Sequence, residues 1–227
     1  RSIDFFNTER RSTDERITAE ALQQIILNED TTCFSTVVFH PSWHKGVIGI
    51  VASRLIETYY RPTVVLTKSE GVLSGSVRSV SGFDVYQALE ACSEFMIQFG
   101  GHKYAAGLTL KPEQLTGFKQ CFEAYAEAHL LPEQLQPTYS YDLELQFDAL
   151  TPKLYRIINQ MAPFGPKNMR PVFVTHLCKD AGGTRAVGKE NNHLKLEITD
   201  AAGIPFQGIA FGMAQYLIQI KNQQSFS

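Results

Sequence analysis

The sequence predicts two domains of different fold class, an α/β domain followed by a small β-barrel. In the first part, helical periodicities alternate with β-branched runs such as residues 33–40, a pattern typical of α/β domains. Later in the chain apolar and polar residues alternate, as at Leu194, Leu196 and Ile198, which indicates half-buried antiparallel strands. The segment LLPEQLQPT, residues 130–138, holds two prolines and no periodicity, so we place the domain boundary there.

The first elements follow from apolar spacing. Ile17, Ala21, Leu22, Ile25 and Ile26 recur at helical intervals and predict a helix with one buried face between Thr13 and Glu29. Residues 1–30 are therefore expected to form a helix ahead of the α/β domain. The α/β domain, residues 31–130, should then contain strands at 33–40, 62–67, 72–80 and 108–110, and helices at 46–59, from Asp84 onward and at 112–129.

The helix from Asp84 is expected to run up to a glycine pair. Asp84 and Gln87 resemble a capping box, and apolar residues continue at helical spacing: Val85, Ala88, Leu89, Cys92, Phe95, Met96 and Phe99. In the stretch GGHKYAAG, residues 100–107, Gly100 would suit a helix C-cap with positive φ, and the pair Gly100 and Gly101 would let a ligand approach the backbone. A helix-terminating glycine followed by a surface histidine is the simpler explanation of His102.

The barrel, residues 138–227, is expected to begin with a half-buried antiparallel strand in which Tyr141, Leu143, Leu145 and Phe147 alternate with polar residues. The remaining pattern predicts a helix at 151–161 and further strands at 171–179, 184–188, 194–198 and 204–211. Such short strands separated by turns suit a small barrel.

The composition is that of an ordinary globular protein, and the net charge argues against a uniformly basic one. Hydrophobic residues make up 44% of the 227 residues and charged residues 19%, which is ordinary for a globular protein with a core. A net charge of −2 argues against a uniformly basic nucleic-acid binder but allows a local basic groove. The charge is segregated along the chain, because Gly165 to Lys195 hold six basic and two acidic residues, whereas Lys111 to Asp148 hold two basic and seven acidic residues.

The four cysteines, Cys33, Cys92, Cys121 and Cys178, are far apart in the sequence and form no Cys-x-x-Cys pair. Neither a zinc site nor a dense disulfide framework is indicated, so we expect reduced thiols. The first residues lack the apolar core of a secretion signal, and no apolar run approaches the roughly 18 residues of a membrane span. These features favour a cytoplasmic protein without membrane contact.

The stretch LSGSVRS, residues 73–79, is a candidate phosphate site. If it is a strand, Ser74, Ser76 and Arg78 share one face by the two-residue period. Two hydroxyls and a guanidinium in a row suit phosphate, because arginine is a charged bidentate donor. A solvated strand face explains the same pattern equally well.

The stretch SWHK, residues 42–45, precedes a predicted helix N-terminus, which attracts anions. His44 is therefore a candidate substrate contact. His40 and His44 are not a credible metal pair, because Pro41 breaks the helix that such spacing would require. We assign no metal site to this sequence.

A basic and aromatic region follows the boundary. The stretches APFGPKNMRPVF, residues 162–173, and VGKENNHLKLEI, residues 187–198, contain Lys167, Arg170, Lys189 and His193 close to Phe164 and Phe173. Positive charge interleaved with aromatic rings suits a groove that follows a single strand of nucleic acid. A solvated loop is the competing interpretation.

These four stretches, in this order, resemble the C-terminal half of the RecJ-type single-strand-specific DNA exonucleases of the DHH phosphoesterase superfamily. WHKGVIGIVASRL, GSVRS and GGHKYAAG are similar to the DHH-associated domain, and PFGPKNMRPVF with VGKENNHLKL to the oligonucleotide-binding (OB) barrel that follows it. The segment NTERRSTDERITAEAL resembles the helix that joins the catalytic domain to this region. The family pattern PFGxGNPxPxF departs here at Lys167 and Met169, which replace its second glycine and its proline.

The resemblance implies a function and roles for particular residues. It implies the substrate-binding part of a single-stranded DNA 5′→3′ exonuclease of DNA repair and recombination, with magnesium or manganese bound by an upstream catalytic domain. Ser74, Ser76 and Arg78 would hold phosphate, and His102 with Gly100 and Gly101 would border the active cleft. No Asp-His-His string occurs, so the chain alone is expected to be inactive. Partners would be single-stranded DNA, that catalytic domain, and a single-strand-binding protein or helicase.

Two other functional classes stay open at this point. A phosphodiesterase for short or cyclic nucleotides would use the first domain but has little use for a basic barrel. A noncatalytic nucleic-acid-binding or tRNA-associated module is the second alternative. Substrate length separates the first alternative from the exonuclease, and strand specificity of binding tests the second.

Overall fold

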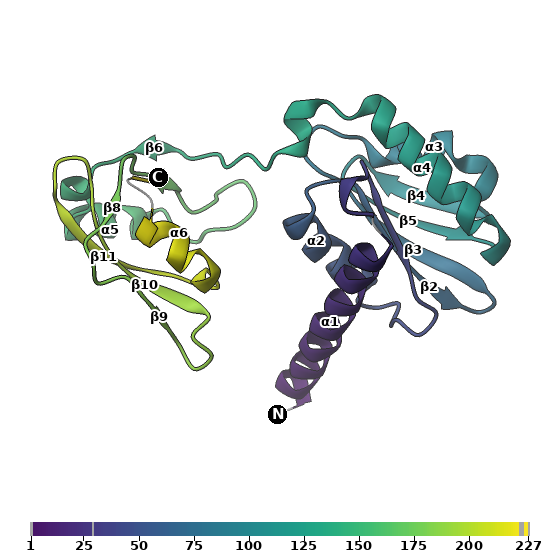
Figure 1. Ribbon diagram of the computed structural model, residues 1–227, viewed down its shortest axis with the longest axis horizontal. Coiled ribbons are helices and arrows are strands. Elements are labelled where there is room, and N and C mark those ends of the chain that lie inside the picture. Colours follow the sequence, from purple (N-terminus) through teal and green to yellow (C-terminus); the bar gives the residue numbers. More distant parts are fainter. Residues whose placement is uncertain (1, 29, 223–224, 227) are drawn as a thin grey trace. The chain divides into compact units, whose positions relative to one another are not determined.

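The computed structural model describes residues 2–28, 30–222 and 225–226. The chain forms two compact units, residues 1–137 and 138–227, each with its own sheet (Figure 1). The first unit contains helices α1 (Ser2–Leu27), α2 (Ile48–Thr58), α3 (Val85–Ala91) and α4 (Leu115–His129), strands β1 (Thr36–Phe39), β2 (Thr63–Ser69), β3 (Val72–Arg78), β4 (Gln98–His102) and β5 (Ala105–Leu110), and short 3₁₀ helices η1 (Asp30–Thr32), η2 (Ser93–Phe95), η3 (Pro112–Gln114) and η4 (Pro132–Leu135).

The sheet of the first unit has five strands in the order β1-β2-β3-β5-β4. β1 and β2 are parallel, and all other neighbours are antiparallel. The β2–β3 turn places Glu70 and Gly71 at φ 53° and 83°, which is the backbone shape that fits a tight hairpin. The strands predicted at 33–40, 62–67, 72–80 and 108–110 are confirmed, and β4 is an additional edge strand.

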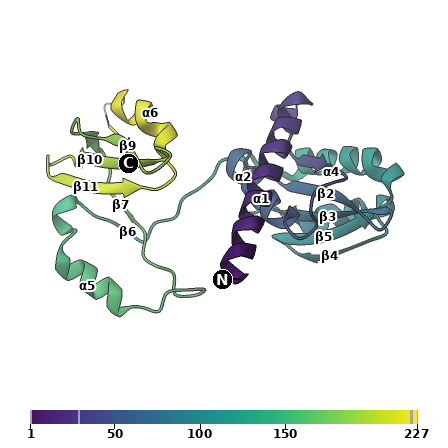
Figure 2. The ribbon, with the colours of Figure 1, turned by 90° about the horizontal axis from the view of Figure 1, so that it is seen from below.

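Helices cover both faces of this sheet (Figure 2). Successive residues of a strand point to opposite faces, and β2 follows this rule. Val64 and Leu66 pack into one buried cluster with Phe118 of α4, while Val65, which lies between them, packs into a second cluster with Leu55 of α2. Both cores are fully buried, so the sheet that carries the candidate site is rigidly held.

Helix α1 is longer than the apolar spacing predicts, because it already begins at Ser2. Ile17 and Ile25 are buried as expected, whereas Ile26 is 60% exposed. The expectation that Ile26 lies on the buried face was wrong, since each residue turns about 100° around a helix. The Trp43 indole Nε1 donates to the Glu20 carboxylate at 2.8 Å. This hydrogen bond lowers the pKa of Glu20, outweighing partial desolvation.

The helix that starts after Asp84 ends much earlier than predicted. Asp84 does cap it, because its carboxylate accepts from the backbone N–H groups of Tyr86 and Gln87. However, α3 stops at Ala91, and residues 98–102 form β4 instead of the last turns of a helix. The glycine pair disfavours a helix, and pairing with β5 gives residues 98–102 hydrogen-bond partners along one side of the strand. The interpretation of Gly100 as a helix C-cap was therefore wrong.

The second unit is built around one central strand. It contains helices α5 (Pro152–Gln160) and α6 (Leu217–Asn222), 3₁₀ helices η5 (Phe147–Ala149) and η6 (Ala214–Tyr216), and strands β6 (Leu143–Glu144), β7 (Phe173–Val174), β8 (Lys179–Asp180), β9 (Arg185–Val187), β10 (His193–Thr199) and β11 (Pro205–Ala210). β10 pairs antiparallel with β11, β8 and β9. Leu194 and Ile198 of β10 are buried, which confirms the alternation predicted there.

The start of the second unit differs from the prediction. Only Leu143 and Glu144 form a strand, and they pair with β7 in parallel. Tyr141 and Leu143 are 47% and 54% exposed, so the expected half-buried antiparallel strand over 141–147 was wrong. An alternation of apolar and polar residues does not specify which strand a segment pairs with. Here β7 pairs with only two residues, Leu143 and Glu144. The helix predicted at 151–161 is confirmed as α5, with the Thr151 hydroxyl as its N-cap.

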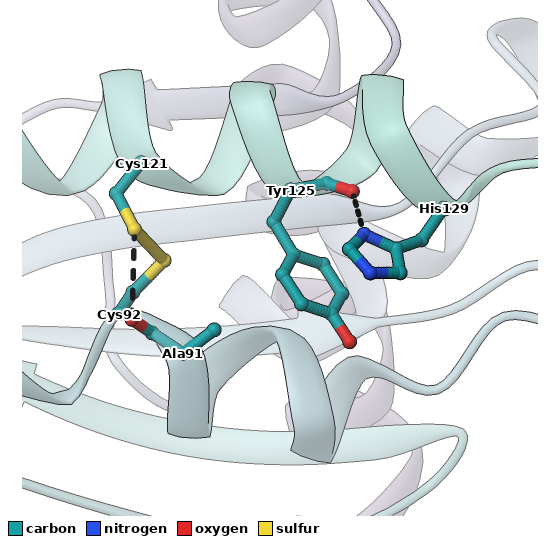
Figure 3. Close-up of a disulfide and its surroundings, with 5 residues drawn as sticks. All are labelled: Ala91, Cys92, Cys121, Tyr125 and His129. Carbon is teal, nitrogen blue, oxygen red and sulfur yellow. Dashed lines mark hydrogen bonds between the residues drawn. A yellow bond between two sulfur atoms is a disulfide. The ribbon is translucent and has the colours of Figure 1, made fainter.

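The cysteines also differ from expectation. Cys92 and Cys121 form a disulfide between the end of α3 and α4 (Figure 3), while among the cysteines of the described residues Cys33 and Cys178 are free. The expectation that all four are reduced thiols was wrong for this pair. Distance along the sequence does not limit pairing once the fold brings two Cα atoms within bonding range.

Candidate nucleic-acid interface

A cleft of about 600 Å³ lies between the N-terminal end of α2 and the sheet of the first unit. The residues that line it are Lys45, Gly46, Ile48 and Gly49 on the helix side and Ser74, Gly75, Ser76, Gln98, Phe99, Gly100, Gly107, Leu108 and Thr109 on the sheet side. Among the described residues, no side chain caps the N-terminus of α2. The first backbone N–H groups of a helix lack partners in the preceding turn, although that of Ile50 donates to the Val47 carbonyl at 2.9 Å, and this end of the helix dipole attracts anions.

The floor of the cleft is partly bare backbone. Ser76 lies opposite Gly107, and Gly107 lies opposite Gly100, so the three residues form one row across β3, β5 and β4. Residues paired across strands project to the same face. Because two of the three lack a side chain, the row leaves a channel in which a ligand can touch the peptide backbone.

The predicted row of Ser74, Ser76 and Arg78 lies on this face of β3. Arg78 Nη1 donates to Ser76 Oγ at 3.1 Å and to the Val77 carbonyl at 2.9 Å. A Cβ atom at Gly49 would lie 2.9 Å from Arg78 Nη2 and 3.1 Å from Ser76 Oγ. The helix therefore approaches the guanidinium and the hydroxyl closely only because residue 49 is glycine. Ser74 and Ser76 line the cleft, and Arg78 sits directly beside it.

The residues of the glycine-histidine stretch point to different faces of the sheet. His102 pairs with Ala105 in the same face row as Arg78, but it is exposed and does not line the cleft. Its Nδ1 accepts from the Tyr104 N–H at 3.3 Å. Gly101 pairs with Ala106 and belongs to the opposite face. Its φ is 151°, and a Cβ atom there would lie 2.4 Å from the Ala105 carbonyl oxygen.

On the helix side, Lys45 rather than His44 lines the cleft. His44 is exposed, and its Nδ1 accepts from the Gly46 N–H at 3.1 Å, so it shapes the turn before α2. The stretch SWHK pointed to this place, but His44 rather than Lys45 was chosen from it as a site residue. Gln98, Gly107 and Thr109 were not predicted as site residues. The signal for Gly107 was present, since a hairpin turning at Lys103 and Tyr104 pairs Gly100 with Gly107.

In the second unit, Lys167 lies on a tight turn and Arg170 follows that turn. Gly165 and Asn168 exchange two backbone hydrogen bonds of 2.9 Å, which leaves Pro166 and Lys167 at the tip. Lys167 has φ 70°, a conformation that glycine adopts most easily in a type II turn. The lysine thus takes a glycine-like backbone conformation at the position where the family pattern has glycine. Arg170 lies 5.0 Å from the centre of the Phe164 ring, a cation–π distance.

Lys189 and His193 lie around the β9–β10 turn. Lys189 is exposed, and His193 is half-buried, with Nδ1 accepting from the Gly212 N–H at 3.0 Å. The His193 ring lies 5.3 Å from that of Phe211, which is 73% exposed. Two residues further along β10, on the same face as His193, Lys195 pairs with Arg185 of β9. This part of the second unit therefore combines basic residues with an exposed aromatic ring, a combination that suits single-stranded nucleic acid.

The described residues offer neither a metal site nor a membrane span. In residues 2–28, 30–222 and 225–226, no group of three or more His, Cys, Asp or Glu side chains could hold a metal ion. Within the same ranges no helix is long and apolar enough to cross a membrane. The donor set of this part of the chain therefore does not fit the metal pair that the resemblance implies.

Comparison with known proteins identifies both units. Residues 30–128 match the DHHA1 domain, and residues 141–227 match the RecJ OB domain. The single-stranded-DNA-specific exonuclease RecJ of Bacillus subtilis is 32% identical over 199 residues, which are 86% of this chain and 25% of that protein. The enzyme of the same name from Escherichia coli K12 is 31% identical over 93% of this chain and 37% of its own length.

Solved structures show the same similarity. RecJ from Thermus thermophilus in complex with Mn²⁺ superposes with a TM-score of 0.74 at 27% identity, over 91% of this chain and 29% of that one. The same protein in complex with Mg²⁺ gives a TM-score of 0.72. The chain spans between 24% and 38% of the length of the curated relatives it matches. The chain belongs to the RecJ family, and it carries a DHHA1 domain followed by a RecJ OB domain.

Proposed function

We propose that this chain is the substrate-binding part of a 5′→3′ exonuclease that degrades single-stranded DNA to mononucleotides. The observation that carries the proposal is the cleft floor, where Ser76 stands beside the bare backbone of Gly107 and Gly100 and faces the N-terminal end of α2. Hydroxyls, backbone groups and a helix N-terminus together suit a phosphodiester. The relatives, which are named single-stranded-DNA-specific exonucleases, support the same substrate.

In the cleft, the proposed phosphate ligands are Ser76 and Arg78, with Ser74 further along the strand and Lys45 on the helix side. Arg78 is bonded through Nη1 to Ser76 and is half-buried, so it is held in place before a ligand arrives. Such preorganisation lowers the entropic cost of binding. His102 would border the end of the cleft at which the strand reacts, and His44 would border the helix side. Gly101 would act by shaping the hairpin.

The second unit would lead the strand to the cleft. Lys167, Arg170 and Lys189 would contact backbone phosphates, while His193 with Phe211 would offer a surface on which a base stacks. Magnesium or manganese would be held by the catalytic part of a complete enzyme, because the described residues do not provide ligands. Without that part, the chain of residues 1–227 would bind single strands but release no nucleotides. Such release following the purified protein would contradict the proposal.

The test of the cleft is binding of a 5′-phosphorylated single strand to the Arg78→Ala variant. A charged hydrogen bond is worth about 1.5–3 kcal/mol, so the affinity should fall by roughly ten- to a hundred-fold. Lys68→Ala is the matched control, because Lys68 lies on the same sheet but opposite Leu73, on the face of α3 and α4. Equal affinities of both variants and the parent chain would remove Arg78 from the site.

Substrate length separates this function from hydrolysis of short or cyclic nucleotides. The match to a RecJ OB domain favours a long substrate. We expect the affinity to rise with strand length well beyond a dinucleotide, because phosphate and stacking contacts accumulate along the second unit. A dinucleotide that binds as tightly as a long strand would support the alternative.

A further inference from the structure

The disulfide between Cys92 and Cys121 lies next to the hairpin that forms the cleft floor. Cys92 follows the last residue of α3, and Cys121 lies in α4 (Figure 3). Their Cα atoms are 5.9 Å apart, which is well inside the range of disulfides. The two cysteines are separated by 29 residues, and the loop they close contains both β4 and β5. Gly100 and Gly107 therefore lie inside a covalent ring.

The fold holds the two sulfur atoms together independently of the bond. Gly117 lies one turn before Cys121, and a Cβ atom there would lie 2.5 Å from the ring of Phe95. This glycine lets α4 pack directly on η2, the short helix that follows Cys92. The Cys121 sulfur is also 3.8 Å from the Ala91 carbonyl oxygen, an acceptor for the thiol when the bond is open. A reduced Cys121 would therefore have a hydrogen-bond acceptor beside it.

The strand that this ring constrains is the least secured of the sheet. β4 is an edge strand, paired on one side only, and most of its residues are exposed. Edge strands with little buried surface open at low free-energy cost. A covalent link just before β4 removes open conformations that the reduced chain can reach.

We propose that Cys92 and Cys121 are a reversible dithiol–disulfide pair that, when oxidised, stiffens the β4–β5 hairpin beneath the cleft. The inference goes beyond single-strand binding, because it assigns redox control to the domain that carries the cleft. Cys92 is fully buried and Cys121 is half-buried, so exchange with small molecules begins at Cys121.

Oxidised glutathione, a small-molecule disulfide, can act as the oxidant that forms the Cys92–Cys121 bond. The Cys121 thiolate attacks one sulfur of oxidised glutathione and expels one glutathione thiolate, which forms a mixed disulfide. The Cys92 thiolate then attacks the Cys121 sulfur and expels the second glutathione. The two protons lost by the cysteines are taken up by the two departing thiolates, so two cysteine thiols and one disulfide give one protein disulfide and two thiols.

Cys33 and Cys178 are internal controls. Burial raises the pKa of the Cys33 thiol, with the nearby Glu123 carboxylate adding to the effect, and burial likewise raises the pKa of Cys178. A raised pKa reduces the thiolate fraction, which is the reactive form. These two thiols should therefore stay reduced in glutathione buffers that oxidise the pair.

The first experiment equilibrates the 227-residue chain in a series of glutathione redox buffers, quenches it with an alkylating reagent under denaturing conditions, and measures intact and peptide masses. We expect two alkylated cysteines at the oxidising end, namely Cys33 and Cys178, and four at the reducing end. Four alkylated cysteines in every buffer, or a bond between other cysteines, would overturn the inference.

The second experiment measures hydrogen exchange of residues 98–110 and the thermal midpoint in the two end states. Oxidation should slow exchange in the hairpin at least several-fold and raise the midpoint of the first unit by about 5–15 °C. Both changes should be absent in Cys121→Ser and present in the Cys33→Ser/Cys178→Ser variant. A disulfide that forms without changing exchange in 98–110 would overturn the stiffening.

Discussion

The two units present their candidate binding residues in different ways. In the first unit, Ser76 and Arg78 lie on an inner strand of a sheet that packs against helices on both faces. In the second unit, Lys167 and Lys189 lie on turns, and the buried cluster of that unit is small, comprising Phe147, Cys178 and Ile198. A site built on inner strands is fixed by packing, whereas a site on turns depends on local backbone geometry. Mutations at the binding residues should therefore affect stability and binding to different degrees in the two units.

The largest expected effect is the loss of core packing in the first unit. Phe118 is fully buried and stacks on Phe122, so Phe118→Ala should lower the free energy of unfolding of this unit by about 3–5 kcal/mol. Phe147, which is 9% exposed, should cost about 3 kcal/mol or less when replaced by alanine. Calorimetry should show each substitution shifting one of two transitions. Equal shifts of both transitions would mean that the units do not unfold independently.

The next prediction contrasts two neighbouring glycines of β4. Gly101→Ala should lower the free energy of unfolding by about 2–4 kcal/mol, because φ is 151° and the added Cβ meets the Ala105 carbonyl oxygen. Gly100 has open space around it and lines the cleft. Gly100→Ala should therefore change stability by less than about 1 kcal/mol yet weaken binding of a short single strand. Denaturant titration and fluorescence anisotropy measure the two effects.

The glycine comparison has a clear contrary outcome. If Gly100→Ala binds single strands as the parent chain does while remaining folded, the bare backbone of the floor plays no part in recognition. If Gly101→Ala is as stable as the parent chain, the positive φ of residue 101 carries no strain for alanine.

At the turn of the second unit, a change to glycine should increase stability, whereas at Gly101 a change from glycine should reduce it. Lys167 has a φ of 70°, which is costly for a residue with a side chain. Lys167→Gly should raise the free energy of unfolding of the second unit by up to about 1 kcal/mol, while weakening single-strand binding through the lost charge. Lys167→Ala is the matched control, since it removes the charge but keeps the strained Cβ. Equal stability of the glycine and alanine variants would contradict the strain argument.

The smallest expected effect is on the salt dependence of binding. Each phosphate contact of a single strand contributes about 0.7 to the slope of log affinity against log salt concentration. Lys189→Ala should reduce the magnitude of that slope by about 0.7 and the affinity by roughly two- to five-fold. Lys153→Ala on α5, also exposed, should leave the slope unchanged. A slope that both variants share with the parent chain would exclude a phosphate contact by Lys189.

Local patterns were enough to predict most elements of the first unit and one half of the cleft. The two-residue period of a strand requires Ser74, Ser76 and Arg78 to share a face, and β3 confirms this. The Asp84 cap was also predicted, because a cap contacts backbone only two or three residues away. The family resemblance was carried by motifs of this local kind.

The other half of the cleft depended on tertiary structure. The alignment of Gly107 and Gly100 with Ser76 requires a register across β3, β5 and β4, and the apolar residues before the glycines fit a helix equally well. Likewise, the partner of Cys92 is a residue 29 positions away, and Lys45 reaches the site only because α2 packs over the sheet. Sequence periodicity reports which face of an element is apolar, whereas strand register and helix packing are decided by contacts between distant segments.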